Sequence, residues 1–270
     1  MNTSRSVLSG LYGLLALALL AAPLQADEKI KSRMVDCDKG QDPAQVLDRE
    51  LGPQRLEMTL VGTCPGFSVS RDDVRIEGDD ENGCPATTAS VDGTIRFDSA
   101  QRAVIACLTV TGSGNGIQAA PGSSIQIFNS SISGNAGVGV FATSSSIQIF
   151  NSSISGNANA GVFANSTASI GLTGSQVMNN GGSGIEIYTN TSADIDNSQV
   201  TGNGTSGGAA DLYLFLQSVA TGQGNTIGAT NLRLDSAILL DGPSIGPVDC
   251  EDTKSSALVN GAVPAECMDY

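Results

Sequence analysis

Residues 123–144 read SSIQIFNSSISGNAGVGVFATS, and residues 145–166 read SSIQIFNSSISGNANAGVFANS. The two segments are identical at 19 of 22 positions. The pattern continues more loosely on both sides, with an apolar residue every 22 or 23 positions at Val110, Ile132, Ile154, Val177 and Val200. A period this short that lasts for several cycles predicts a solenoid.

The residue types indicate that the solenoid is built from β-strands. Runs such as Ile125-Gln126-Ile127-Phe128 alternate like short strands, and Asn-Ser and Gly-Asn pairs are typical of the turns between them. Leu is scarce in the repeat, which excludes leucine-rich repeats. We therefore predict an all-β fold, a parallel β-helix with ~22-residue coils, and a right-handed one because strand crossovers favour that hand. The inward residues are expected to be Ile125, Ile127, Ile132 and Val140.

A polar column follows the same period. Asn135, Asn157, Asn180 and Asn203 recur at the spacing of the apolar positions. Because amides at one coil position can stack from rung to rung, we expect these Asn side chains to form a hydrogen-bonded ladder.

The sequence also predicts a cover for the open strand edges at both ends of the coil. Asp42 and Pro43 are an N-cap and a first helical residue, Gly52-Pro53 ends the segment, and Leu47 and Leu51 lie on its apolar face. At the other end, a non-repetitive tail follows the coils. We predict a signal peptide over 1–26 and a single domain over 27–270, which consists of an N-terminal cap (27–59), coils (60–235) and a C-terminal cap (236–270).

The N-terminal segment has the features of a secretory signal peptide. Arg5 precedes an apolar run over 14–22, and Ala26 is a small residue suited to cleavage before Asp27. A retained anchor is the alternative, but the run is shorter than the ~20 residues that span a bilayer. We predict a secreted or periplasmic protein that does not span a membrane.

Six cysteines follow the signal segment: Cys37, Cys64, Cys84, Cys107, Cys250 and Cys267. An even number in an exported chain favours disulfides. Six cysteines allow 15 pairings, and sequential pairing (37–64, 84–107, 250–267) is the simplest. A thiolate metal site is disfavoured because the chain has no CxxC spacing, and we predict no metal centre.

The composition excludes several functions. The chain has no His, 27 acidic and 13 basic residues, and a formal net charge of −14. Without His there is no Ser-His-Asp triad, no Cys-His nucleophile and no histidine metal site. Nucleic acid is not an expected partner, because phosphate contacts need Lys and Arg.

The segments SIQIFNSSISGN and SGIEIYTNTSADIDNSQVTGN resemble the right-handed parallel β-helix repeats of pectate-lyase-like proteins. The resemblance covers roughly residues 60–235 and implies the fold. That family includes pectate lyases, polygalacturonases, alginate-modifying enzymes, phage spikes and proteins without known catalysis. The resemblance therefore implies a polysaccharide or cell-surface glycan as partner and leaves the activity open.

Three carboxylates are the candidate catalytic residues. Asp194 aligns with Gln126 and Gln148 and is expected to face outward with Asp196 on one strand, whereas Glu186 lies on another. Paired carboxylates can serve hydrolysis or bind Ca²⁺, which is the only cofactor we consider. The alternative is a solvated acidic patch. Lyase chemistry is disfavoured because residues 103–232 contain no Lys or Arg to act as the base.

Aromatic residues are the candidate ligand-binding residues. Phe128 and Phe150 recur one coil apart, Phe141 and Phe163 do the same, and Tyr188 lies near Glu186. Outward rings would offer apolar platforms to sugars, whereas inward rings would be a core ladder.

Two further clusters have simple structural interpretations. Asp36, Asp38, Gly40 and Asp42 faintly resemble a calcium loop, but Cys37 interrupts it. The arginines of the first coils lie among acidic residues, which favours surface ion pairs; they are Arg71, Arg75, Arg96 and Arg102.

The sequence therefore favours an exported β-helix protein that binds a polysaccharide along its outer face. A polysaccharide lyase or glycoside hydrolase that uses Asp194, Asp196 and Glu186 is one alternative. A structural or adhesive scaffold without a ligand site is the other.

Overall fold

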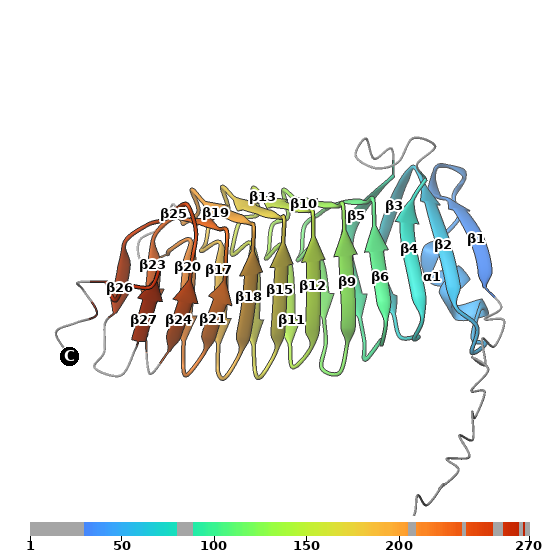
Figure 1. Cartoon of the computed structure of the whole chain (residues 1–270). Helices are drawn as coiled ribbons and strands as arrows, with labels where there is room; N and C mark the ends of the chain where they lie inside the picture. The colour runs from blue at the N-terminus through green and yellow to red at the C-terminus, as the bar shows by residue number, and fades with distance from the viewer. Residues whose placement is uncertain are drawn as a thin grey trace, which may run out of the picture.

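The computed structural model describes residues 30–79, 89–204, 209–233, 236–250, 256–264 and 267. The expected signal peptide lies outside them. Within these residues, the main chain winds as a parallel β-helix whose strands lie side by side from β1 at one end to β27 at the other (Figure 1). Three faces run along its length.

The first face is an 11-stranded parallel sheet of described strands. Its strands, in spatial order, are β1 (Lys31–Asp36), β2 (Leu56–Val61), β4 (Val74–Gly78), β6 (Ala103–Ala106), β9 (Ser124–Phe128), β12 (Ser146–Phe150), β15 (Ser169–Thr173), β18 (Ser192–Asp196), β21 (Val219–Gly222), β24 (Ala237–Leu240) and β27 (Ser256–Val259).

The other two faces meet at the long strand β5 (Ser90–Phe97), whose two halves pair with different strands. The second face contains β7 (Thr109–Thr111), β10 (Ser131–Ser133), β13 (Ser153–Ser155), β16 (Gln176–Met178), β19 (Gln199–Thr201), β22 (Thr226–Ile227) and β25 (Ser244–Ile245). The third face contains β8 (Ile117–Ala119), β11 (Val140–Thr143), β14 (Val162–Asn165), β17 (Ile185–Tyr188), β20 (Leu212–Phe215), β23 (Thr230–Leu232) and β26 (Val248–Cys250). Strand β3 (Thr63–Val69) pairs with β5.

The register confirms the period that the sequence predicts. Ile125 pairs with Ile147, and Ile147 pairs with Ile170, so each Ile lies directly beside its counterpart one repeat later. All four predicted inward residues have a relative exposure of 1% or less. Because every coil buries the same apolar columns, the core is one continuous stack of Ile, Val, Leu and Ala.

The predicted Asn ladder is confirmed. Asn135 Nδ2 donates to Asn157 Oδ1 at 2.8 Å, Asn157 to Asn180 at 2.9 Å, and Asn180 to Asn203 at 2.9 Å. The first three of these residues are at most 1% exposed. Each accepting Oδ1 also accepts the backbone N–H of the preceding Asn, so the side chains satisfy buried backbone donors where the chain turns.

A second buried ladder runs along the corner between the first and second faces. The backbone N–H groups of Ser130, Ser152 and Ser175 donate to the hydroxyl groups one coil on, which belong to Ser152, Ser175 and Ser198 respectively. The residue before each Ser has a left-handed backbone, with φ of +47° at Asn129 and +60° at Gly174. This explains why Asn and Gly both occur at that position, since both tolerate the conformation.

The N-terminal end is closed by a helix, as predicted. Helix α1 (Pro43–Arg49) follows η1 (Cys37–Lys39), and Asp42 caps it by accepting from Ala44 N at 2.9 Å. Leu47 is buried in the core, but the expectation for Leu51 was wrong. Leu51 is 82% exposed, because the helix ends at Arg49 and the chain turns away.

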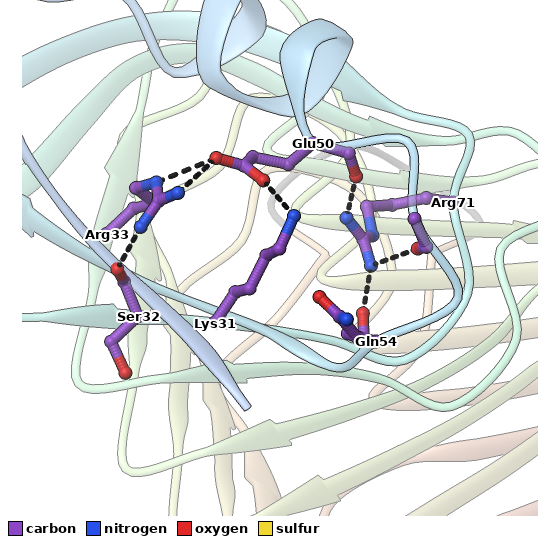
Figure 2. A network of polar contacts seen from close by, with 7 residues as sticks. Lys31, Ser32, Arg33, Glu50, Gln54 and Arg71 are labelled. Carbon is purple, nitrogen blue, oxygen red and sulfur yellow. Dashed lines mark hydrogen bonds and ion pairs between the residues drawn. The ribbon is translucent and has the colours of Figure 1, made fainter. Parts of the chain in front are cut away.

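A polar network ties this cap to the first coils (Figure 2). Glu50 accepts from Lys31 Nζ at 2.9 Å and from Arg33 Nε at 2.7 Å. Arg71 donates to the backbone carbonyls of Glu50, Gly52 and Gln54. Arg71 is therefore a structural residue that holds the turn between α1 and β2.

Disulfides close both ends of the described coil. Cys37 pairs with Cys64 and Cys250 pairs with Cys267, as sequential pairing predicts. Cys107 is also disulfide-bonded, while Cys84 lies outside the described residues, so the third pairing stays a prediction. Strands β1 and β2 begin before residue 60 and β24 to β27 follow residue 235, so coil structure extends to both sides of the 60–235 segment.

Candidate functional site

The structure places Asp194 and Asp196 on the outer side of β18, on the first face. The register aligns Asp194 with Gly171 and, one coil earlier, Gly171 with Gln148, which matches the sequence alignment. Both carboxylates already accept hydrogen bonds from the next coil. Thr221 Oγ1 donates to Asp194 at 3.2 Å, and Gln223 N donates to Asp196 at 3.0 Å.

Glu186 is not brought together with that pair. It lies on β17 of the third face, and the chain turns a corner at Thr189 and Asn190, which have φ of +55° and +54°. Glu186 is half-buried, and its carboxylate accepts no hydrogen bond from the described part of the chain. Its neighbours across the sheet are Phe163 and Tyr213.

These neighbours belong to a row of rings that we call the aromatic strip. It runs along the long axis over β11, β14, β17 and β20 and consists of Phe141, Phe163, Tyr188, Tyr213 and Phe215. Phe141 and Phe163 stack with centroids 5.2 Å apart. The centroid of the Tyr188 ring lies 5.3 Å from the ring centroids of both Phe163 and Phe215. The five rings are half-buried and face outward, so they are surface residues that also stack on one another.

Polar groups accompany the rings. Glu186 lies in register between Phe163 and Tyr213, and the Arg233 guanidinium lies over the Tyr213 ring at 5.9 Å. Burial, with smaller contributions from Glu186 and Tyr213, raises the pKa of Tyr188 to about 12. Tyr188 is therefore a neutral hydroxyl at all physiological pH values.

The sequence pattern identified Phe141, Phe163 and Tyr188 but missed Tyr213, Phe215 and Arg233. The segment between Ile185 and its partner Leu212 is longer than the repeat, so the regular spacing breaks there. The available signal was the alternation of Leu212-Tyr213-Leu214-Phe215, which has the same pattern as Ile185 to Tyr188.

The other aromatic pair lies on the first face. Phe128 and Phe150 stack with centroids 4.8 Å apart, and both are half-buried and outward. The residue in register with Phe128 on the preceding strand is Ala106, which is too small to cover a ring. Phe128 therefore ends its stack, beside a depression in the surface.

This first-face depression has a volume of about 580 Å³. Its lining residues are Arg55, Asp73, Arg75, Arg102, Val104, Ser124, Ile125, Gln126, Phe128 and Gln148. Three guanidinium groups, two primary amides and one aromatic ring thus converge on one concavity. The repeat in the sequence does not predict that these residues share a surface, because the first coils differ in length. The segment between the paired residues Arg75 and Val104 is much longer than the segment between the paired residues Leu56 and Val74.

The predicted surface ion pairs of the arginines are present. Arg75 pairs with Glu77 at 2.6 Å, Arg96 pairs with Asp98 at 2.8 Å, and Arg102 pairs with Asp73. Of these arginines, Arg75 and Arg102 lie in the depression. Arg96 lies on the third face, in register with Gln118 of β8.

The resemblance of residues 36–42 to a calcium loop has a structural explanation. Asp36 accepts from Lys39 N and pairs with Lys39 Nζ at 2.6 Å, Asp38 accepts from Thr63 N at 3.3 Å, and Asp42 caps α1. In the part of the chain that the structure describes, no three His, Cys, Asp or Glu side chains are grouped as metal ligands would be. Binding of Ca²⁺ stays a prediction without structural support. No helix among the described residues is long and apolar enough to cross a membrane.

The parallel sheets, with columns of aromatic and charged side chains on their outer faces, define the class of the protein as a parallel β-helix. Comparison with known proteins gives the family. Residues 85–227, more than half of the chain, match the family model described as right handed beta helix region. The chain belongs to this family, which also confirms the predicted hand. No curated protein matches the sequence.

Solved structures with the same fold are distant in sequence. The crystal structure of pectate lyase Pel9A has a TM-score of 0.51 and 11% identity, over 88% of this chain and 83% of that one. ORF18 of Geobacillus virus E2 has a TM-score of 0.51 and 11% identity, over 84% of this chain and 60% of that one. The A-module of the Azotobacter vinelandii mannuronan C-5 epimerase AlgE6 has a TM-score of 0.41 and 12% identity, over 88% and 89%. At 11% identity, the likeness to the first two structures shows the fold alone.

Proposed function

We propose that the protein is an exported β-helix protein that binds a polysaccharide along its outer face, and that the aromatic strip is the binding surface. The observation that carries this proposal is the length of the strip. Its rings follow the long axis of the solenoid across four strands of the third face. A row of this kind suits an extended chain of sugar rings better than it suits a small compact ligand.

The chemistry of the strip supports the same ligand class. The C–H faces of pyranose rings are apolar and pack on aromatic side chains, which are large and rigid contact residues. Sugar hydroxyls need hydrogen-bond acceptors and donors at the edge of such a platform. The Glu186 carboxylate supplies an acceptor that the described part of the chain leaves unused, and the Tyr188 hydroxyl supplies a donor.

Export is part of the proposal. Disulfides persist in oxidising compartments, and the described chain has Cys37–Cys64 and Cys250–Cys267. Residues 1–26 have the features of a secretory signal, which would place the protein in the periplasm or outside the cell.

Binding is favoured over hydrolysis by the positions of the carboxylates. A glycosidase needs two carboxyl groups that flank one bond. Glu186 lies on a different face from Asp194 and Asp196, and both aspartates are hydrogen-bonded to the next coil. The likeness to pectate lyase Pel9A, at 11% identity, concerns the fold and is no argument for activity.

The experiment is affinity electrophoresis of the mature protein through gels that contain neutral glucans, galactans or mannans. The test variant is the double substitution Phe163→Ala/Tyr188→Ala in the strip. The matched control is Phe128→Ala/Phe150→Ala, which removes two outward stacked rings from the first face. We expect the strip variant to lose at least about tenfold in affinity for the polysaccharide. Aromatic anchor residues contribute most of the binding energy of such a surface, and the substitutions remove two of them.

Equal retardation of the strip variant and the wild type would reject the strip as the surface. Release of reducing ends from any of these polysaccharides, abolished by Asp194→Asn/Asp196→Asn, would replace binding by the hydrolase alternative. If no polysaccharide, neutral or anionic, retards the wild-type protein, the binding proposal is rejected. The structural or adhesive scaffold without a ligand site is then the favoured alternative.

A further inference from the structure

The first face carries opposite charges at equal distances from its central strand. Strand β12 is the sixth of the eleven described strands, the arginine-lined depression includes β6, two strands before it, and Asp194 and Asp196 lie on β18, two strands after it. We propose that the first face is the interface of a symmetric dimer, in which the depression of each copy receives Asp194 and Asp196 of the other. The inference is independent of the proposed function, because the aromatic strip lies on the third face.

A two-fold axis along β12 brings the opposite charges together. In a symmetric dimer both copies use the same surface, so that surface must be complementary to itself. An axis along β12 turns the second solenoid end to end, so β6 faces β18 of the partner and β9 faces β15. An axis along the solenoid would instead place each depression on its own copy, with arginine against arginine. The charges therefore select the first arrangement.

The depression has donors for a carboxylate. Nε of Arg75 donates to Glu77, but the two terminal nitrogens of Arg75 donate no hydrogen bond within the described residues. The Arg55 guanidinium makes only a 3.5 Å ion pair with Glu57. A guanidinium can hold a carboxylate with two parallel hydrogen bonds. Val104 of β6 lies next to Arg75 in the outward column, and its short side chain leaves room for a carboxylate from the partner.

The two aspartates have no cation of their own. Neither carboxylate makes an ion pair with the described residues, and residues 103–232 contain no Lys or Arg. Thr221 and Gln223 each donate to one oxygen of these carboxylates, which leaves the second oxygen of each without a hydrogen bond from the described chain. Paired negative charges on an outer strand are stabilised when a positive patch of a partner covers them.

The side chains between β6 and β18 also fit about this axis. Phe128 on β9 faces Thr173 on β15 of the partner, where the neighbouring Gly171 has no side chain and the Gln148 amide lies over it. Phe150 lies on β12, at the axis, and meets its own copy. Half-buried rings that pack on each other lose their remaining contact with water, which favours association.

Exposed apolar side chains at the two ends of the face meet as well. Met34 on β1 is 64% exposed, Leu239 on β24 is 48% exposed, and Leu258 on β27 is 37% exposed. Because β1 and β27 are the first and last strands of the sheet, the axis places Met34 over β27 of the partner. Large apolar side chains exposed on a sheet face are typical of an interaction surface.

The first face is large enough for a stable dimer. Eleven strands at a spacing of about 4.8 Å, each with about five residues at a rise of about 3.4 Å, cover about 50 Å by 17 Å. That area is close to the ~800 Å² that each partner buries in an interface of standard size.

The experiment is sedimentation equilibrium of the mature protein over a range of protein concentrations. The two test variants are Asp194→Arg and Arg75→Glu, each of which reverses one charge of the contact. The matched controls are Asp92→Arg and Arg96→Glu, which make the same changes on the two halves of β5, on the second and third faces. A final sample is an equimolar mixture of the two test variants.

We expect the wild type and both controls to be dimers, and each test variant to dissociate at least tenfold more readily. The mixture of Asp194→Arg with Arg75→Glu should form dimers again. In the mixed dimer, the introduced arginine of one chain meets the introduced glutamate of the other, and the second contact keeps its native charges. Recovery of the dimer would also show that both variants are folded.

A wild type that is monomeric at every concentration would overturn the proposal and leave the first face to a different partner. Dimers of either test variant as tight as those of the wild type, or a mixture that stays monomeric, would also overturn it. The Phe163→Ala/Tyr188→Ala variant should remain a dimer, and its dissociation would place the interface on the third face instead.

Discussion

At the scale of single residues, buried amides determine where each coil turns. The Asn157 side chain makes four ladder hydrogen bonds: its Oδ1 accepts twice from Asn135, and its Nδ2 donates to Asn180 and to the carbonyl of Ile132. Asn157 is 1% exposed, so water cannot replace these partners. The ladder explains why Asn recurs with the period of the apolar core.

The variant Asn157→Ala should therefore be unstable. It leaves the buried backbone N–H of Asn135 and one of the two N–H groups of the Asn135 side-chain amide without acceptors, and each unsatisfied group costs about 1–3 kcal/mol. We expect the free energy of unfolding to fall by about 3 kcal/mol or more, measured by urea unfolding followed by circular dichroism.

The matched control is Asn151→Gly at the exposed corner. Asn151 has φ of +48°, and Gly174 occupies the same position one coil later with φ of +60°. Because Gly adopts this conformation without strain, stability should change by about 0.5 kcal/mol or less. Equal losses in the two Asn variants would contradict the role assigned to the ladder.

Tyr188 offers a spectroscopic test of the packing in the strip. Burial raises its pKa to about 12, so it should stay neutral when an ordinary Tyr, with pKa 10.0, has ionised. Ultraviolet titration of the mature protein should show a component near pH 12 that Tyr188→Phe removes. A folded pKa above the unfolded value means that stability is complete below pH 10 and falls as pH rises toward 12. A single transition near pH 10 in the native protein would show that the strip is open to water.

At the scale of elements, the coil is a unit that can be removed whole. Residues 145–166 begin and end at the same register positions as residues 123–144, since Ser124 pairs with Ser146 and Val140 with Val162. Deletion of 145–166 joins Ser144 to Thr167, and the natural junction is also Ser-Thr.

The protein without residues 145–166 should fold and unfold cooperatively, because each coil contacts only its neighbours. Its melting temperature should fall by only a few degrees. Deletion of 145–155 alone removes half a coil, places the next strand on the wrong face and should abolish folding. Circular dichroism and thermal melting of both variants test this expectation; folding of the half-coil deletion would contradict the register.

The N-terminal cap has a pH dependence of its own. Hydrogen bonds from Lys31 and Arg33 hold the pKa of Glu50 below its usual 4.5. The contribution of Glu50 to stability is therefore present above pH 4.5 and is lost as pH falls through the lowered folded pKa. We expect Glu50→Gln to be less stable than the wild type at neutral pH and equal to it in strong acid, in thermal melts under both conditions. A difference that persists in acid would mean that Glu50 acts through packing.

Local sequence predicted the elements well wherever the period held. Strands, inward Ile columns, the Asn ladder and the cap at Asp42 follow from nearest-neighbour patterns. Tyr213 and Phe215 were missed because the coil before them is longer than the repeat, and Arg55 was missed because the first coils vary in length. Which side chains share a surface depends on coil length, and coil length is set by loops that carry no repeat.

At the scale of the whole molecule, the outward columns divide the surface by face. The third face has the aromatic strip with Glu186, and the first face has the arginine depression near one end and Asp194 and Asp196 further along. The proposed binding function uses the third face, because the aromatic strip follows the long axis of the solenoid there.

The most direct test of the central claim is hydroxyl-radical footprinting of the mature protein with and without a neutral polysaccharide that retards it. Tyrosine and phenylalanine rings are readily oxidised, and mass spectrometry locates the change. Oxidation of Tyr188, Tyr213 and Phe163 is predicted to fall severalfold on binding, while Phe128 and Phe150 are unchanged. Unchanged oxidation along the aromatic strip, with protection on another face, would contradict it.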